Sequence, residues 1–324
     1  MIYKFKKKYT WIVTGGAGFI GSNLISLLLK SNQKVICIDN FVTGKKINIK
    51  NFYLNKNFIL LKKDIREKIN LNLKADFFIH LAALGSVPRS FLKSTETNDV
   101  NVTGSLKMYE LSKKLNVKKF IFASSSSVYG NSKNKIKKES DKLNPISPYG
   151  LSKYIFEKYL FQISHQYEIN CYGLRFFNVY GPNQNDRGPY APVISKWIRN
   201  SIQKKVSILF GNGRSIRDFT HVDNVLTAII SLALCKRKIS KFNVFNIGTG
   251  RPISLNDLYK KIKNKLNKFN IKMRIRKEKS RDGDIKFSSS DISKAKIFFS
   301  YTPLVYIDEG LDKYINCLIK NGKK

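Results

Sequence analysis

Residues 10–30, TWIVTGGAGFIGSNLISLLLK, decide the fold. A β-branched apolar run leads into a glycine-rich turn, and a helical pattern of leucine and isoleucine follows it. Gly15, Gly18 and Gly21 stand between the two. Glycine at these positions permits a tight turn, close approach of backbone N–H groups to a pyrophosphate, and close packing of the helix on the strand. The segment therefore predicts a strand, a phosphate-binding turn and a helix.

Further apolar runs continue the alternation of strand and helix. They are residues 35–40, 58–64, 76–83, 118–126 and 170–181. Such alternation is typical of a parallel sheet with helices on both faces, and runs that are apolar throughout suit strands buried on both sides. Beyond these runs the pattern loosens into a loop rich in Pro and Asn, which indicates a second lobe. We predict an α/β protein with a Rossmann-type doubly wound parallel sheet and a smaller α/β substrate-binding lobe.

The second predicted strand ends in Asp39, 18 residues after Gly21. A carboxylate there can bind the adenosine ribose and repels a 2′-phosphate, so we expect NAD as the cofactor rather than NADP. His80 lies inside an apolar run and is interpreted as a core residue. The predicted cofactor site comprises Gly15, Gly18, Phe19, Ile20, Gly21, Asp39, Asn40, Asp64, Ile65, Ala82 and Ala83.

These patterns predict a division of the chain. Residues 1–178 form the NAD-binding Rossmann domain, and residues 219–247 return to it. Residues 179–218 and 248–324 form the substrate-binding lobe.

A second group of polar residues follows the fifth predicted strand. That strand ends in the serines 124–127, and SPYGLSK follows at residues 147–153. Ser147 can cap a helix that begins with Pro148, which places Tyr149 and Lys153 one turn apart on one face. A nearby ammonium, a cationic nicotinamide and the helix N-terminus all favour the phenolate of tyrosine, whose reference pKa is about 10. Tyr149 can then exchange a proton with a sugar hydroxyl while a serine binds the same oxygen.

Over nearly its whole length the chain resembles the extended short-chain dehydrogenase/reductases, and within them the nucleotide-sugar 4-epimerases. The likeness is carried by the glycine motif, the strand-end carboxylate, the serines and YxxxK, in this order. It implies that Tyr149 is the catalytic base and Lys153 its activator, both also in contact with the cofactor. It further implies that Ser125, with Ser126 beside it, supplies the catalytic hydroxyl, and that Asn98 belongs to the cofactor pocket.

The serine segment separates sister activities within the resemblance. Sugar 4,6-dehydratases carry an Asp-Glu pair there and UDP-glucuronate decarboxylases a Glu, whereas this chain has Ser126 and Ser127. Dehydration and decarboxylation are thereby disfavoured. Reversible oxidation at C4 remains, with the hydride returned to the opposite face of the sugar, so that NAD stays bound.

The resemblance also implies a nucleotide-sugar site. Small residues matter in it, because Ser288 stands where epimerases restricted to glucose and galactose carry a bulky tyrosine, and a small side chain leaves room for an N-acetyl group. Arginines from separate segments can grip a diphosphate. The predicted substrate site comprises Gly85, Ser86, Ser125, Ser126, Ser127, Asn178, Ala191, Val193, Arg217, Arg281, Asp284 and Ser288.

We therefore expect C4 epimerisation of UDP-GlcNAc and UDP-GalNAc or of the corresponding uronic acids. A UDP-glucuronate or UDP-glucose 4-epimerase is the alternative. The net charge of +38 favours an alternative of another class, a noncatalytic NAD-binding protein with a basic nucleic-acid-binding surface. Lysines are scattered along the whole chain without an aromatic-basic module, so a lysine-biased genome explains the charge better and a nucleic-acid partner is not expected.

Composition limits the remaining classes. Cys37, Cys171, Cys235 and Cys317 are too widely spaced to predict a zinc knuckle or a redox pair, and we expect no metal. No run approaches the roughly 20 apolar residues that span a bilayer, and no signal-peptide core precedes the first strand, so we expect a cytoplasmic protein without a membrane partner. The resemblance implies a homodimer, and polysaccharide biosynthesis is a hypothesis for its pathway.

Overall fold

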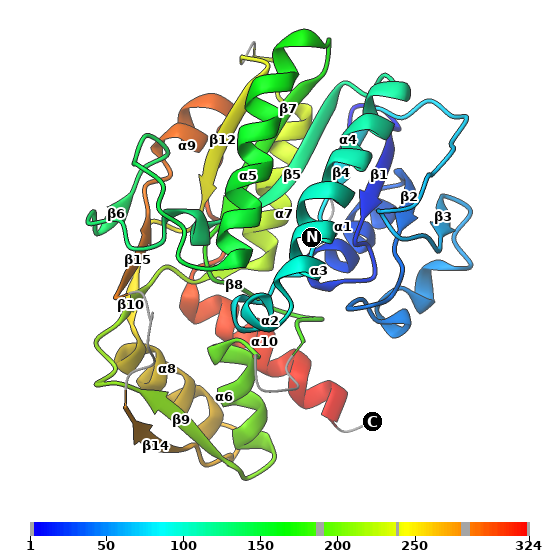
Figure 1. Ribbon diagram of the computed structural model, residues 1–324. Coiled ribbons are helices and arrows are strands. Elements are labelled where there is room, and N and C mark those ends of the chain that lie inside the picture. Colours follow the sequence, from blue (N-terminus) through cyan, green and yellow to red (C-terminus); the bar gives the residue numbers. More distant parts are fainter. Residues whose placement is uncertain (1–2, 186–190, 238–239, 280–285, 323–324) are drawn as a thin grey trace.

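The computed structural model describes residues 3–185, 191–237, 240–279 and 286–322. Within them a seven-stranded sheet forms the centre of the molecule, in the order β12-β7-β5-β4-β1-β2-β3 (Figure 1). Its strands are β1 (Thr10–Thr14), β2 (Lys34–Ile38), β3 (Phe58–Leu61), β4 (Phe77–His80), β5 (Lys119–Ser125), β7 (Asn170–Phe176) and β12 (Phe242–Ile247). All neighbouring strands are parallel. The predicted doubly wound sheet is confirmed, and the strand order reverses between β1 and β4, where such sheets bind their ligands.

Helices cover both faces of this sheet. They are α1 (Phe19–Lys30), α4 (Ser105–Lys114), α5 (Pro148–Ile163), α7 (Val222–Leu234) and α9 (Ser293–Phe299). The short helices α2 (Val87–Leu92) and α3 (Ser94–Asn98) pack on α5. A π-helical segment, η3 (Asp99–Gly104), joins α3 to α4. The helix α5 begins as predicted, because Ser147 Oγ accepts the N–H of Gly150 at 3.1 Å and Pro148 occupies the first turn.

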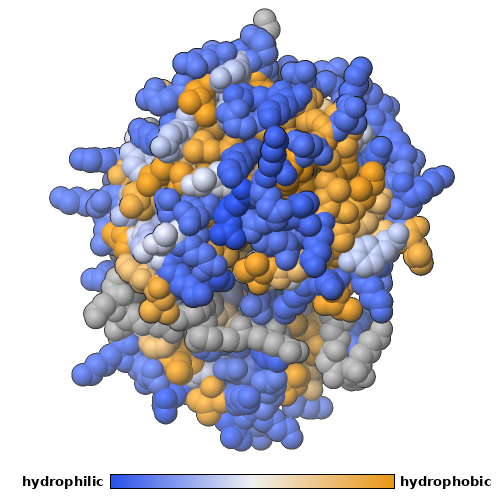
Figure 2. Space-filling model, turned by 45° about the vertical axis from the view of Figure 1, so that its right-hand side comes forward, coloured by the Kyte–Doolittle hydropathy of each residue, from blue (hydrophilic) through white to orange (hydrophobic). Residues whose placement is uncertain are grey.

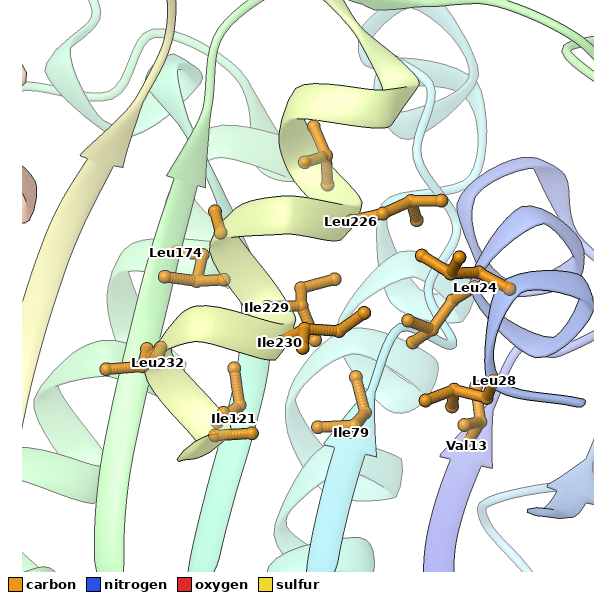
Figure 3. Packing of buried hydrophobic residues seen from close by; sticks show 14 of the residues in the cluster. Val13, Leu24, Leu28, Ile79, Ile121, Leu174, Leu226, Ile229, Ile230 and Leu232 are labelled. Carbon is orange, nitrogen blue, oxygen red and sulfur yellow. The ribbon is translucent and has the colours of Figure 1, made fainter. Parts of the chain in front are cut away.

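The apolar face of each helix explains its place. Leu24 and Leu28 of α1 and Ile229 and Ile230 of α7 pack on one face of the sheet (Figure 3). On the other face, Met108 of α4 and Phe156 and Leu160 of α5 pack against strand residues such as Phe78 and Phe120. The inner strands β1, β2, β4, β5 and β7 are largely buried on both sides, as their continuous apolar runs predict, whereas the edge strand β3 is partly exposed.

A second, smaller group of elements lies beyond the carboxyl edge of the sheet (Figure 1). Its helices are α6 (Val193–Ile202), α8 (Leu255–Asn267) and α10 (Ile307–Gly322). Its strands are β6 (Ile136–Lys137), β8 (Val179–Tyr180), β9 (Val206–Phe210), β10 (Ile216–Arg217), β11 (Thr220–His221), β13 (Ile253–Ser254), β14 (Arg274–Glu278) and β15 (Phe287–Ser290). Trp197, Ile262 and Tyr314 belong to a separate buried cluster that holds the three helices together.

The chain crosses between the two groups more than once. The strand β12 pairs with β7, and α7 packs on the sheet, both within the segment predicted to return. Ala295 and Phe299 of α9 also pack in the sheet cluster, although they belong to the segment predicted for the second lobe. The domain boundaries therefore stay a prediction.

The surface carries the excess of polar residues. Figure 2 shows one face on which hydrophilic side chains are spread widely, with apolar side chains exposed between them. Among the described residues, no helix combines the length and the apolar character needed to cross a membrane.

Candidate active site

A cleft of about 830 Å³ runs along the carboxyl ends of the central strands. It brings together most of the predicted site from both lobes. The predicted residues that line it are Gly15, Gly18, Phe19, Ile20, Gly21, Asp39, Asn40, Asp64, Ile65, Ala82, Ala83, Gly85, Ser86, Ser125, Ser126, Ser127, Tyr149, Lys153, Asn178, Ala191 and Val193.

The glycine turn forms one wall of the cleft, and its backbone leaves no room for side chains. Gly15 has φ +69°, and a Cβ there would lie 2.7 Å from the backbone nitrogen of Ala82. A Cβ on Gly21 would collide with the Gly15 carbonyl oxygen. The helix α1 begins at Phe19 behind Gly18, which provides no side-chain cap, so the first N–H groups of α1 remain for a ligand. This arrangement fits the pyrophosphate of NAD.

Carboxylates close the adenosine end of the cleft. Asp39 accepts the N–H of Ala17 at 2.9 Å and that of Phe41 at 2.7 Å. Burial raises the pKa of Asp39, and these two hydrogen bonds oppose the rise. Asn40 Nδ2 donates to Asp64 Oδ2 at 2.8 Å, which joins the ends of β2 and β3. The residues at this end are those expected to bind a ribose without a 2′-phosphate.

The predicted catalytic residues meet where β5 and α5 face each other. Tyr149 and Ser125 both line the cleft, and their hydroxyls interact. Burial raises the pKa of Tyr149, and the Ser125 hydroxyl opposes this rise. Lys153 Nζ donates to the carbonyl oxygen of Ala123 at 2.9 Å. Burial lowers the pKa of Lys153 to about 8 against the opposing charge of Glu157, which leaves the ammonium protonated at neutral pH.

The strand-end serines have separate roles. Ser125 Oγ accepts the N–H of Ser127 at 3.1 Å and so starts the short helix η4 (Ser126–Tyr129). Ser126 and Ser127 line the cleft and carry no carboxylate into it. Ser124, the remaining member, donates instead to Glu157 Oε1 at 2.5 Å. The segment thus offers hydroxyls but no acid or base to a substrate.

The asparagine predicted for the cofactor pocket lies away from the cleft, so its cofactor role stays a prediction. Asn98 is exposed at the end of α3 and lines a different depression, together with Ser94 and Leu151. Asn101 is buried instead, and its Oδ1 accepts the N–H of Leu84 at 2.8 Å while its Nδ2 donates to Ser152 Oγ at 3.0 Å. The π-helical turn of η3 rotates the later asparagine inward, and a sequence pattern does not reveal such a turn.

The cleft is also lined by residues that were predicted to bind the sugar, namely Ser86, Asn178, Ala191 and Val193. Asn178 has φ +35°, and its Nδ2 donates to the carbonyl oxygen of Asp218 at 3.0 Å. Ala191 and Val193 lie at the start of α6. Ser86 Oγ accepts the N–H of Arg89 at 3.3 Å and therefore also caps α2.

The described residues do not assemble the predicted diphosphate grip. Arg217 and Ser288 face each other on the neighbouring strands β10 and β15, but neither lines the cleft. Arg281 and Asp284 lie outside the described residues. For these residues the substrate role stays a prediction.

Several cleft residues were not predicted as site residues. Arg89 and Glu96 form an ion pair at 3.1 Å on its wall, and Lys45 and Gln184 also line it. Lys45 follows Asp39 closely, and that proximity was the only signal for it in the sequence. The others are brought to the cleft by folding of α2, α3 and the loop after β8.

His80 is a core residue, as interpreted from the sequence. Its Nδ1 lies 2.7 Å from Thr14 Oγ1 and its Nε2 lies 2.8 Å from Ser105 Oγ. Burial lowers the pKa of His80 to about 3, so the imidazole stays neutral. The side chain joins β4 to β1 and α4 and takes no part in the cleft.

A dinucleotide cleft with a Ser–Tyr–Lys set at its centre defines the class of extended short-chain dehydrogenase/reductases. Residues 11–248 match the NAD dependent epimerase/dehydratase family. The chain belongs to this family and is an NAD-dependent enzyme. The noncatalytic alternative is thereby set aside.

Known relatives extend the likeness to nearly the whole chain. The chain is similar to the UDP-N-acetylglucosamine 4-epimerase from Methanobrevibacter ruminantium in complex with UDP-N-acetylmuramic acid, with TM-score 0.89, 34% identity and coverage of 97% of this chain and 99% of that one. It is similar to the UDP-glucose 4-epimerase from Thermotoga maritima with UDP-glucose, with TM-score 0.88, 33% identity and coverage of 96% and 99%. A curated UDP-glucuronate 4-epimerase from Thermodesulfobacterium geofontis is 30% identical over 94% of this chain and 95% of its own length.

Proposed function

We propose that the protein catalyses NAD-dependent C4 epimerisation of a UDP-sugar through a transient 4-keto intermediate. The observation that carries the proposal is that Ser125, Tyr149 and Lys153 line the same cleft as the glycine turn. The names of the relatives support a UDP-sugar as substrate.

The chain's own residues supply proton transfer and positioning. The Lys153 ammonium favours the phenolate of Tyr149, which accepts the proton of the C4 hydroxyl. Ser125 donates to the same oxygen and stabilises the charge that develops there. Bound NAD supplies reversible hydride transfer at C4. Tyr149 then returns the proton after the sugar has presented its other face.

The serines beside the catalytic pair restrict the reaction to epimerisation. Elimination of a C5 proton or loss of a carboxyl group needs a further acid or base, and Ser126 and Ser127 are neither. The 4-keto sugar therefore has one outcome at this wall of the cleft, which is reduction.

We propose UDP-GlcNAc and UDP-GalNAc, or the corresponding uronic acids, as the preferred substrates. Gly85 is exposed on the cleft wall, and a Cβ there would meet no atom within 4 Å, so space for an N-acetyl group remains beside it. Ser288 would add to this space if β15 contacts the sugar. UDP-glucuronate and UDP-glucose are the alternative substrates, which the names of two relatives favour.

Proton NMR tests the reaction and the substrate together. Purified protein is incubated separately with UDP-GlcNAc, its uronic acid, UDP-glucose and UDP-glucuronate, without added reductant. We expect conversion of an acetylated sugar to its C4 epimer. No turnover of any of the four by protein that holds NAD would overturn the proposal, and faster turnover of an unacetylated sugar would move it to the alternative.

We also propose a homodimer formed through α2 and α5. The two helices pack together, and Phe91, Leu92, Leu151 and Tyr159 of this pair are exposed. Exposed apolar side chains that are gathered on adjacent helices indicate a contact surface. Analytical ultracentrifugation at micromolar concentration should show the dimer, and monomer alone would refute it.

A further inference from the structure

A buried ion pair lies behind the catalytic residues, on the side away from the cleft. Arg175 of β7 donates through Nη2 to Glu157 Oε2 at 2.7 Å and through Nε to Glu157 Oε1 at 3.0 Å. The two side chains are only 3% and 5% exposed. Burial of both charges costs more than their attraction returns unless further hydrogen bonds satisfy them, so a buried pair is weak support for stability alone.

Three consecutive residues of β5 contact three residues one turn apart on α5. The carbonyl oxygen of Ala123 accepts a hydrogen bond from the Lys153 ammonium, and the Ser124 hydroxyl donates one to the Glu157 carboxylate. The hydroxyl of Ser125 interacts with that of Tyr149. The helix positions are i, i+4 and i+8, which share one face. The contact of Glu157 therefore belongs to the same helix–strand seam that holds both catalytic side chains.

The ion pair is itself fixed from the far side. Arg175 Nη1 donates to Tyr129 Oη at 2.9 Å, and this hydroxyl donates to Asn246 Oδ1 of β12 at 2.6 Å. The arginine thus connects β7, η4 and β12 to the helix through the Glu157 carboxylate. A guanidinium held by such a network keeps the carboxylate in one orientation.

We infer that Glu157 is a positioning residue for catalysis, which keeps Lys153 charged and in register with Tyr149, while Arg175 holds the Glu157 carboxylate in place. This inference rests on the proposed function. Nothing in the resemblance or in the relatives' names assigns a role to either residue of the pair.

The charges around Lys153 make the inference testable. On its own helix the described groups are Tyr149 and Glu157, and from β4 it faces His80, which stays neutral. Arg175 of β7 stands behind Glu157. Among these groups Glu157 supplies the charge that opposes the fall in the pKa of Lys153 that burial causes.

The first variant is Glu157→Gln, which keeps the shape and removes the charge. In this variant the Lys153 ammonium should lose its proton at lower pH than in the wild type. The alkaline limb of the kcat/KM profile should therefore move to lower pH by about 0.5 to 1 unit. The substrate is the UDP-sugar turned over fastest by the wild-type protein. An unmoved limb in a folded variant would overturn the inference.

A second variant covers the case in which Glu157→Gln fails to fold. The double variant Glu157→Gln with Arg175→Gln removes both charges. The alkaline limb of its kcat/KM profile should lie between that of the wild type and that of the single variant. Tyr129→Phe is the matched control, because it removes a hydrogen bond of Arg175 without changing a charge, and its limb should coincide with the wild-type limb. If the control moves as far as the charge variants, the pair is merely structural.

A readout without turnover separates this inference from the proposed function. The pKa of Lys153 is lower in the folded than in the unfolded protein. A further fall of this pKa in the variant destabilises the folded state at pH values below the folded pKa. This destabilisation is lost as the pH rises through the folded pKa. The difference in unfolding free energy between wild type and Glu157→Gln should shrink as the pH rises through the alkaline limb. A difference independent of pH contradicts the inference, whereas wild-type protein that turns over no UDP-sugar contradicts only the proposed function.

Discussion

Replacement of Asn101 by alanine tests how η3 holds the floor of the cofactor cleft. The Asn101 side chain is fully buried, and it binds both backbone groups of Leu84 and the hydroxyl of Ser152. Leu84 follows Ala82 and Ala83 at the end of β4, on the wall of the cleft. The asparagine therefore joins the cofactor wall to the helix that carries Tyr149.

The cost of the replacement follows from the bonds that it removes. The buried N–H of Leu84 loses its acceptor at 2.8 Å, which costs about 1 to 3 kcal/mol. The Leu84 carbonyl loses a longer bond of 3.3 Å, and Ser152 keeps its bond to the carbonyl oxygen of Tyr149 at 2.8 Å. We therefore expect the free energy of unfolding to fall by about 2 to 4 kcal/mol. If about 1.4 kcal/mol of this appears in the wall of the cleft, NAD affinity falls about tenfold.

Equilibrium urea denaturation and NAD titration measure the two effects. Asn98→Ala is the matched control, because this exposed asparagine lies three residues earlier, and a surface substitution should cost less than about 0.5 kcal/mol. A loss below about 1 kcal/mol for Asn101→Ala, or an equal loss for the control, would refute the account of this turn.

Three further changes address the chemistry and the cofactor wall. Tyr149→Phe removes the proton acceptor and should lower turnover by about 10²- to 10⁴-fold, measured by NMR, with bound NAD retained in the released-nucleotide assay. Gly21→Ala places a Cβ against the Gly15 carbonyl and should weaken NAD binding at least tenfold by titration, while Gly85→Ala, whose Cβ meets nothing, should bind NAD as the wild type does. Ser125→Ala removes the hydroxyl that opposes the raised pKa of Tyr149, so this pKa should rise further. The acid limb of the kcat/KM profile should therefore move to higher pH. A shift of the acid limb to lower pH would contradict the interaction between Ser125 and Tyr149.

The parts of the site that are local in sequence were predictable. The glycine turn, Asp39 and the pair Tyr149 and Lys153 each lie within one strand–turn–helix segment or one helical turn. Local geometry follows from such spacing, because steric limits on the turn and the period of the helix fix it. The parallel strand pattern was predictable for the same reason.

The remaining features depend on contacts between distant segments. Asn98 is exposed at the end of α3, whereas the π-helical turn buries Asn101 three residues later. In the sequence Glu157 looks like an ordinary residue on the surface of a helix. Only the packing of α5 beside β7 brings it to Arg175 and buries the pair. Composition does not reveal such pairings, since a charge is buried only where the fold supplies its partner.

Asp218 joins the strands predicted to bind the nucleotide to the central sheet. Asp218, next to Arg217, is buried and accepts the N–H of Thr249 at 3.0 Å, just beyond the end of β12. The same carboxylate accepts the Ser290 hydroxyl at 2.5 Å, at the end of β15. Arg217 and the strand of Ser288 are therefore anchored to the central sheet through one residue. We predict that a UDP-sugar bound by these strands is positioned by the same sheet that positions Tyr149.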